Sequence, residues 1–147
     1  MTAAAVKAEG NAPDKLSLVV FSGDFERVHY ALVLAAGAIA SNKPVTLFFT
    51  MGAAKALMKE QGWTRLPSSE ASSASAMDKL FAERGIGTFE ELLAACETLG
   101  VVFMVCEMGL KALGLDAADL RGDITIKPGG VVTFLADASK DGTMMFI

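Results

Sequence analysis

Short apolar runs alternate along this chain with segments in which apolar residues recur every three or four positions. The runs are rich in β-branched and large apolar residues, which is typical of buried strands. They predict strands at Lys15–Phe21, Pro44–Thr50, Gly100–Cys106, Asp123–Lys127 and Thr143–Ile147. The periodic segments predict helices at Phe25–Ser41, Ala53–Gln61, Met77–Glu83, Thr88–Leu99 and Val131–Ser139, and a short helix or turn at Glu107–Gly114. Strands that alternate with helices indicate an α/β fold with a mostly parallel sheet and right-handed crossovers.

The pattern also divides the chain. Its 147 residues are the usual size of one domain. We expect a flexible N-terminal tail over residues 1–14 and one α/β domain over residues 15–147. Between residues 63 and 76 the periodicity fails, because Pro67 and the serine-rich segment Ser68–Ser75 interrupt it. We predict a mobile, solvated loop there, with a lid over a site as the alternative.

Two apolar surfaces predict self-association. In the segment Phe25–Ser41 one side carries Phe25, Val28 and Leu32, and the opposite side carries Val33 and Ala36, so the helix is apolar nearly all round. The chain also ends on the apolar run 144–147. A small monomer has no need of such surfaces, so we expect a homo-oligomer.

Composition and charge exclude several classes of protein. The sequence is 52% hydrophobic and 20% charged, with a mean hydropathy of +0.44, which excludes a disordered chain. The net charge of -4 makes nucleic acid an unlikely partner by electrostatics. The longest uncharged stretch, Val28–Asn42, is too short to span a membrane, and the N-terminus has no apolar stretch of the signal-peptide type. We therefore expect a cytoplasmic protein with no transmembrane segment.

Sites in open parallel sheets gather at the carboxyl ends of the strands. Cys106 is the strong nucleophile at these ends, and a following helix N-terminus would stabilise its thiolate, although Glu107 opposes this. A structural role, as a small buried hydrophobe, is the alternative. The other residues predicted to line a pocket there are Ser22, Gly23, Asp24, Thr50, Met51, Gly52, Glu107, Met108 and Lys127.

The remaining candidates favour packing over chemistry. Cys96 lies on the apolar stripe of a predicted helix, and its ten-residue spacing from Cys106 matches no CxxC or metal motif. His29 has no second ligand at useful spacing, so we predict a helix-face or interface residue and no metal site. Ser22, Asp24 and His29 could be assembled into a triad, but no G-x-S-x-G elbow supports one.

The sequence around Cys106 resembles the segment around the active cysteine of the DsrE/DsrF-like family of sulfur-relay proteins. The stretch that carries the likeness is Leu99–Met108, with Gly114 and Leu115 after it. Further matches occur at Leu18–Asp24, Val45–Thr50 and Thr88–Leu93. The resemblance covers most of the chain from Lys15 onward.

This resemblance implies a three-layer α/β sandwich with a central, mostly parallel five-stranded sheet of Rossmann-like or flavodoxin-like topology. It also implies homotrimers or hexamers, and a cysteine that carries persulfide sulfur to or from a TusA-like carrier or a rhodanese, without a cofactor. The cysteine carried over is Cys106. Similar members have a serine shortly after the cysteine. Gly109 stands at that place here, so the serine hydroxyl that could assist the sulfur is missing.

Three functions follow as hypotheses. The first is a sulfur carrier or sulfurtransferase component that uses Cys106, since a thiolate alone can accept and donate sulfur. Ser22, Asp24 and Thr50 would form the polar wall of its pocket, with assistance from Lys127. The second is a non-catalytic module that binds a small anion or nucleotide. The third is a thiol redox sensor or peroxidase, which the absence of a resolving cysteine at good spacing disfavours.

Overall fold

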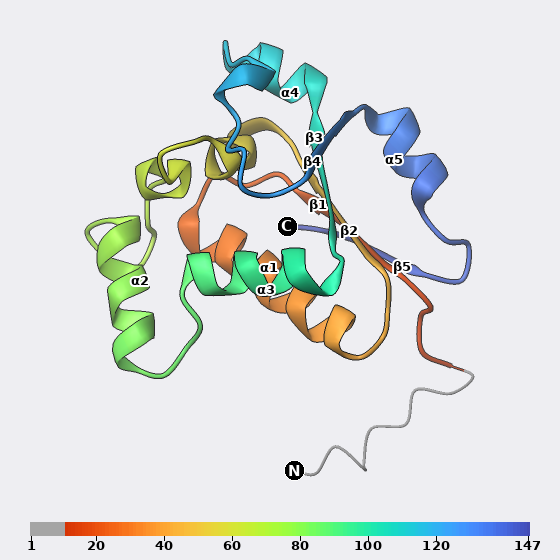
Figure 1. Ribbon diagram of the computed structural model, residues 1–147, viewed down its shortest axis with the longest axis horizontal. Coiled ribbons are helices and arrows are strands. Elements are labelled where there is room, and N and C mark those ends of the chain that lie inside the picture. The colour runs from red at the N-terminus through yellow and green to blue at the C-terminus, as the bar shows by residue number, and fades with distance from the viewer. Residues whose placement is uncertain (1–10) are drawn as a thin grey trace.

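A computed structural model describes residues 11–147 and shows five parallel strands (Figure 1). The strands are β1 (Leu16–Val20), β2 (Val45–Phe49), β3 (Val102–Cys106), β4 (Ile126–Gly129) and β5 (Thr143–Phe146). They form one sheet in the order β4-β3-β2-β1-β5, and every neighbouring pair is parallel. The predicted α/β fold with a five-stranded parallel sheet is confirmed.

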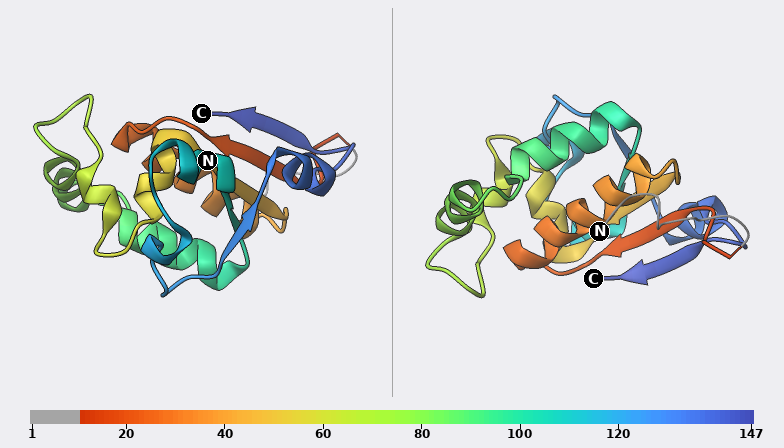
Figure 2. Two further views of the ribbon diagram at one scale, coloured as in Figure 1. Left: turned by 90° about the horizontal axis from the view of Figure 1, so that it is seen from above. Right: turned by 90° about the horizontal axis from the view of Figure 1, so that it is seen from below.

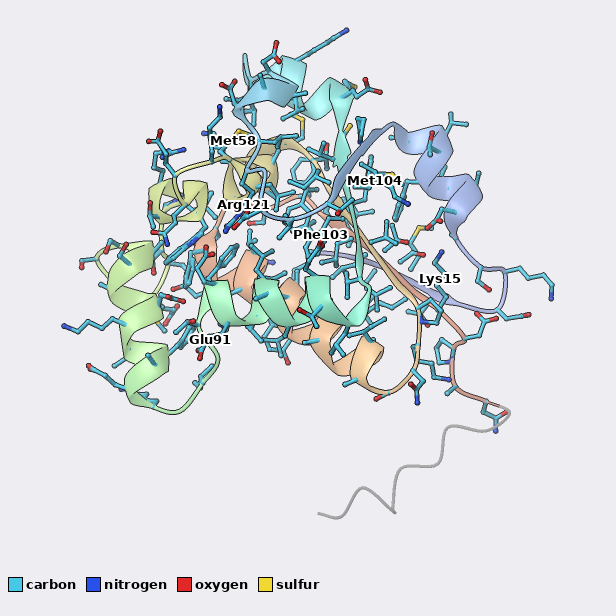
Figure 3. All side chains as sticks on the ribbon, in the orientation of Figure 1. Lys15, Met58, Glu91, Phe103, Met104 and Arg121 are labelled. Atoms are coloured by element: carbon cyan, nitrogen blue, oxygen red, sulfur yellow. The ribbon has the colours of Figure 1, made fainter. Side chains whose placement is uncertain are left out.

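Strand alternation gives the sheet two faces of different character. Phe103 and Met104 are successive residues of β3, and their side chains point to opposite faces (Figure 3). Phe103 packs in the main core, whereas Met104 packs with Phe48, Cys106 and Phe134. We call these surfaces the α3 face and the α5 face, after the helices that cover them.

The α3 face is filled over β1, β2 and β3, and an apolar hollow remains beside β5, between Met145 and α1. Helices α1 (Phe25–Ala40) and α3 (Phe89–Leu99) lie across it and belong to the same core cluster. A capping box begins α3, in which Thr88 and Glu91 satisfy each other's backbone N–H groups. The strand side chains on this face are almost completely buried: Leu18, Val20, Leu47, Phe49 and Phe103.

The α5 face is only partly covered. Helix α5 (Val131–Asp137) lies on the side of the sheet opposite α1 and α3 (Figure 2). It rests on the sheet through Phe134, whose ring stacks on Phe48 with 4.8 Å between centroids. At its end, the Asp137 carboxylate accepts hydrogen bonds from Lys15 Nζ (2.8 Å) and Thr46 Oγ1 (2.6 Å). Burial by itself raises the pKa of Asp137, but these bonds and the neighbouring lysines outweigh it and lower the pKa.

The segment after β2 differs from its prediction. A regular helix was expected over Ala53–Gln61, but the chain forms two short 3-10 helices, η2 (Met51–Leu57) and η3 (Gly62–Arg65). Glu60 and Gln61 between them both have positive φ, which ends regular helix geometry. Trp63 of η3 is buried in the main core, and its Nε1–H donates to the Glu90 carboxylate at 2.7 Å.

The serine-rich segment is anchored in the structure, where a mobile loop was predicted. Ser68 donates its hydroxyl to Glu26 at 2.5 Å, and the backbone N–H of Ser69 donates to the same carboxylate at 3.0 Å. These bonds outweigh burial and lower the pKa of Glu26. Helix α2 (Ala74–Glu83) then begins three residues earlier than expected, because the Ser73 hydroxyl caps it by accepting from the Ala76 N–H.

Two predictions concern the ends of the chain. The first ten residues of the predicted tail lie outside the described residues, whereas Asp14 accepts a hydrogen bond from Ser139 at 2.7 Å. In the described part, no helix has both the length and the apolar character needed to cross a bilayer.

Candidate functional site

Cys106 is the last residue of β3 and the residue that precedes α4 (Glu107–Ala112). Its side chain is 1% exposed. The Gly109 backbone N–H donates a hydrogen bond to Sγ at 3.4 Å, which is a sulfur-compatible distance. The strand thus delivers the thiol to the carboxyl edge of the sheet, and the first turn of α4 supplies a donor that favours a negative sulfur.

Thr50 directly follows β2, the strand next to β3, and lies beside Cys106. Phe49 pairs with Val105 in the β2–β3 register, so Thr50 and Cys106 are the next positions along and lie about 5 Å apart at their Cα atoms. Both side chains continue the alternation of Phe48 and Met104, which places them on the α5 face. Thr50 is 7% exposed.

These two residues line an apolar groove of about 430 Å³ on the open part of the α5 face. That volume is within the usual range of ligand pockets. Walls come from the sheet, from α4 and from α5, and no charged side chain of the described residues lines them. We call this hollow the Cys106 groove, and its lining residues are Val19, Phe21, Phe48, Thr50, Met51, Cys106, Met108, Val131, Phe134, Leu135, Met144 and Phe146.

Gly109 has no space for a side chain. A Cβ built on it would lie 2.7 Å from the Met51 backbone nitrogen and 2.8 Å from Thr50 Oγ1. Met51 itself has a φ of +48°, an uncommon conformation for a side chain of its size. The close approach of α4 to the end of β2 therefore requires glycine at residue 109, and the Thr50 hydroxyl occupies the space that a serine there would enter.

The predicted pocket is assembled in part. Thr50, Met51 and Met108 lie in the Cys106 groove. Gly23 and Gly52 instead pack backbone against backbone, since a Cβ on Gly52 would meet Gly23 Cα at 3.1 Å. They allow the loops after β1 and β2 to touch, and they do not line the groove.

The predicted polar wall at the end of β1 is absent from the groove lining. Ser22 Oγ accepts from the Asp24 N–H at 3.1 Å and closes a local turn. The Asp24 carboxylate accepts from the Ser69 hydroxyl at 3.2 Å. Both residues therefore organise the start of α1, and of the three predicted wall residues only Thr50 lines the groove.

Two charged candidates are also displaced from the groove. Glu107 begins α4 and is exposed. Lys127 was predicted at the end of a strand, but β4 continues through Pro128 to Gly129, and Gly129 is the residue that pairs with Cys106. Lys127 pairs with Met104, is exposed and lies near Asp137, where its charge contributes to the lowered pKa of that carboxyl.

Sequence analysis missed most of the apolar wall. Phe21, Leu135 and Phe146 are 44%, 54% and 69% exposed, and all three line the groove. The available signal was strand alternation: Val19 and Phe21, like Met144 and Phe146, are two residues apart and share a face with Cys106. Only the terminal apolar run was noticed, and it was assigned to self-association.

Cys96 and His29 lie on the other side of the sheet. Burial raises the pKa of the Cys96 thiol to about 11, and its Sγ lies 3.7 Å from the Leu32 carbonyl oxygen. His29 is buried, with Nε2 at 2.8 Å from the Gly87 carbonyl oxygen and its ring against Phe81. Cys96 is a packed core residue, as predicted, and His29 is also buried within the fold, where a helix-face or interface position was expected.

Comparison with known proteins gives three findings. The family model of the DsrE/DsrF/DrsH-like family matches residues 51–146. An uncharacterised protein of Bacillus subtilis, YrkE, is 27% identical, and the alignment covers 90% of this chain and 96% of YrkE. A protein of unknown function from Methanobacterium thermoautotrophicum, MTH1491, shares the fold with a TM-score of 0.56 at 13% identity, over 90% of this chain and 98% of that one. The chain therefore belongs to the DsrE/DsrF/DrsH-like family, and this membership supports a general function of the sulfur-relay kind.

Proposed function

We propose that this protein carries sulfur as a persulfide on Cys106 and exchanges it with the thiol of a partner. The observation that carries the proposal is the position of Cys106, which lies in the floor of an apolar groove and accepts a hydrogen bond from the Gly109 N–H. A sulfur anion in such a place has a donor to stabilise it and a space in which a second sulfur fits.

The transfer step needs one thiol at this site. The Cys106 thiolate attacks the outer sulfur of a donor persulfide, R–S–SH. A new S–S bond forms to Cys106, the donor S–S bond breaks, and its electron pair leaves with RS⁻. The outer sulfur keeps its proton or releases it to solvent. The reverse step, with an acceptor thiolate as the attacking group, unloads the protein, so the exchange requires no separate oxidant or metal.

The partner must bring its sulfur into an apolar environment. The groove walls carry Phe21, Met108 and Phe146, which are all partly exposed, so a docked partner would bury them and exclude water and small thiols from the persulfide. We propose a TusA-like carrier or a rhodanese as this partner, on the basis of the family.

The same surface supports self-association as a homotrimer or hexamer. Exposed apolar surface continues past the groove on α5, where Val132 is 82% exposed. A patch of this kind on a small protein indicates an interaction surface. Sedimentation at micromolar concentration should give the mass of an oligomer, and a mass of 15.4 kDa would contradict this part of the proposal.

Features of the site disfavour the two alternatives. An anion or nucleotide requires positive or polar groups, whereas the groove lining of the described residues includes no charged side chain, and Lys127 does not line the groove. A thiol redox sensor requires a resolving thiol. The only other cysteine, Cys96, is buried on the opposite face with a raised pKa.

Intact-protein mass spectrometry under non-reducing conditions tests the proposal. Wild type and the matched variants Cys106→Ser and Cys96→Ser are incubated with a low-molecular-weight persulfide donor. We expect one added sulfur on wild type and Cys96→Ser, reversed by reductant, and none on Cys106→Ser. Absence of sulfur from all three forms would contradict the proposal and favour a binding module, which a thermal-shift screen of anions and nucleotides would then examine.

A further inference from the structure

The unexplained polar group in the Cys106 groove is the hydroxyl of Thr50. Its side chain is more than nine-tenths buried and lines the groove with Cys106. Within residues 11–147 the structure gives this hydroxyl no hydrogen-bond partner, whereas Thr46, on the same strand and face, donates its own hydroxyl to Asp137 at 2.6 Å. No fully buried side-chain nitrogen or oxygen of the described residues lacks a partner, so the Thr50 hydroxyl reaches the surface of the groove and can bond to an atom bound there.

We infer that the Thr50 hydroxyl holds the outer sulfur of the persulfide on Cys106 by donating a hydrogen bond to it. This inference rests on the proposed function. Thr50 makes no hydrogen bond with Cys106 Sγ in the sulfur-free protein, but an added sulfur lies about 2 Å beyond Sγ, in the groove that both residues line. The Thr50 hydroxyl therefore makes this hydrogen bond only when Cys106 carries the added sulfur.

Gly109 explains why the donor comes from β2 and not from α4. A side chain at residue 109 would collide with Thr50 Oγ1 and with the Met51 backbone. The Gly109 N–H donates a hydrogen bond to Sγ at 3.4 Å. Because residue 109 has no side chain, the Thr50 side chain occupies the space next to it. Each sulfur of the persulfide then has one donor: the Gly109 N–H for the inner sulfur and the Thr50 hydroxyl for the outer sulfur.

A hydrogen bond to the outer sulfur favours its anionic form. Unwanted discharge occurs when a small thiolate R′S⁻ attacks the outer sulfur: a bond forms to R′S, the Cys106 S–S bond breaks and its electron pair returns to Cys106. The attack is slower on an anion because of charge repulsion. Thr50 is thus a positioning residue that prolongs the life of the carried sulfur.

The test compares sulfur-loaded wild type with Thr50→Val, Thr50→Ser and the matched control Thr46→Val. Two quantities are measured: the half-life of the loaded sulfur in a small thiol, and the pH midpoint at which the ultraviolet absorbance of the persulfide anion appears. In Thr50→Val we expect a half-life about fivefold shorter and a higher midpoint, the size of one lost hydrogen bond. Thr50→Ser and Thr46→Val should keep wild-type values, although Thr46→Val loses stability.

Each outcome has a separate meaning. If wild type loads sulfur and Thr50→Val matches it in half-life and midpoint, this inference is overturned and the carrier function stands. If wild type does not load sulfur, the proposed function fails first. Near-ultraviolet circular dichroism establishes that the variants fold, and Thr50→Ala, which also removes the hydroxyl and has the same expected result, replaces Thr50→Val if that variant does not fold.

Discussion

The two faces of the sheet are built from the same strands, yet one is closed and the other is left open. On the α3 face, Phe103 and its neighbours are covered by two long helices and are almost fully buried. On the α5 face, one short helix covers Phe48 and Met104, and the remaining apolar side chains form the walls of a groove. Each face also has one cysteine, Cys96 packed against α1 on the closed side and Cys106 in the groove on the open side.

This difference shows how a small protein separates folding from chemistry. The closed face supplies most of the apolar burial that stabilises the domain. The open face keeps apolar surface available for a partner, and it places a thiol and a hydroxyl where that partner arrives. Mutations should therefore have separable effects, large on stability at the α3 face and large on sulfur handling at the α5 face.

The largest expected effect comes from truncating equivalent aromatic residues on the two faces. Phe103→Ala should lower the free energy of unfolding by about 3–5 kcal/mol, because it leaves a cavity in a filled core. Phe146→Ala removes a ring that is 69% exposed and lies tilted against Phe21, so it should cost about 1 kcal/mol or less. Urea denaturation measures both values, and equal losses would contradict the division between the faces.

A second pair of variants tests the close packing at the site. Gly109→Ala places a methyl group 2.7 Å from a backbone nitrogen, so it should cost about 2 kcal/mol and impair sulfur loading. Gly37→Ala, in the middle of α1, meets nothing within 4 Å and should stabilise the protein by about 0.5–1 kcal/mol. Thermal unfolding should move in opposite directions for the two, and a neutral Gly109→Ala would refute the need for glycine there.

A third prediction concerns the ion pair that fastens the loop before β4 to α3. Arg121 donates to both carboxylate oxygens of Glu90, at 2.7 and 2.9 Å, and these bonds lower the pKa of Glu90 despite its partial burial. Glu90→Gln should cost about 1–2 kcal/mol at pH 7. A lowered carboxyl pKa contributes stability above the unfolded value of about 4.3, and that contribution disappears as pH falls through the folded value.

The difference in stability between the variant and wild type should therefore shrink as the pH falls below about 4.3. Urea titrations between pH 3 and 7 measure the difference. A gap that stayed constant over that range would show that the glutamine disturbs packing rather than charge.

The last prediction involves no change in stability and concerns how readily the two cysteines are alkylated. The Cys96 thiol is buried, and this burial raises its pKa to about 11, so the thiol is protonated at pH 8. An alkylating reagent should therefore not modify Cys96 in the folded protein. Cys106 is only 1% exposed, but it lines the groove and should therefore react faster than Cys96. Peptide mass spectrometry after brief alkylation measures both sites, with urea-unfolded protein as the control in which both react. Preferential modification of Cys96 in the folded state would contradict the assignment of the two faces.

The sequence predicted what depends on local periodicity. Four of the five strands and most helices were placed correctly, since buried parallel strands are continuous apolar runs and the Thr88–Glu91 capping box defines the start of α3, whereas β4 lies further along the chain than predicted. Cys106 was found because it ends such a run. The 3-10 turns after β2 were missed because they depend on the left-handed residues Glu60 and Gln61, which no glycine announces.

The rest of the site depends on tertiary geometry. Lys127 was misplaced because β4 continues through Pro128, which an edge strand tolerates. Ser22 and Asp24 were assigned to the pocket because they follow a strand, but the serine segment far along the chain engages Asp24. The role of Gly109 follows only from the distance between α4 and the end of β2, which a sequence pattern does not contain.

The central claim is that Cys106 both accepts sulfur and passes it on. The direct measurement is a single-turnover transfer in which wild-type protein, loaded with radiolabelled sulfur and freed of donor, is mixed with a purified TusA-like carrier. The account predicts that label leaves this protein and appears on the carrier thiol in equal amounts, faster than it passes to free cysteine at the same concentration, and that Cys106→Ser transfers none. Label that never loads, or that leaves no faster for the carrier than for free cysteine, would contradict the account.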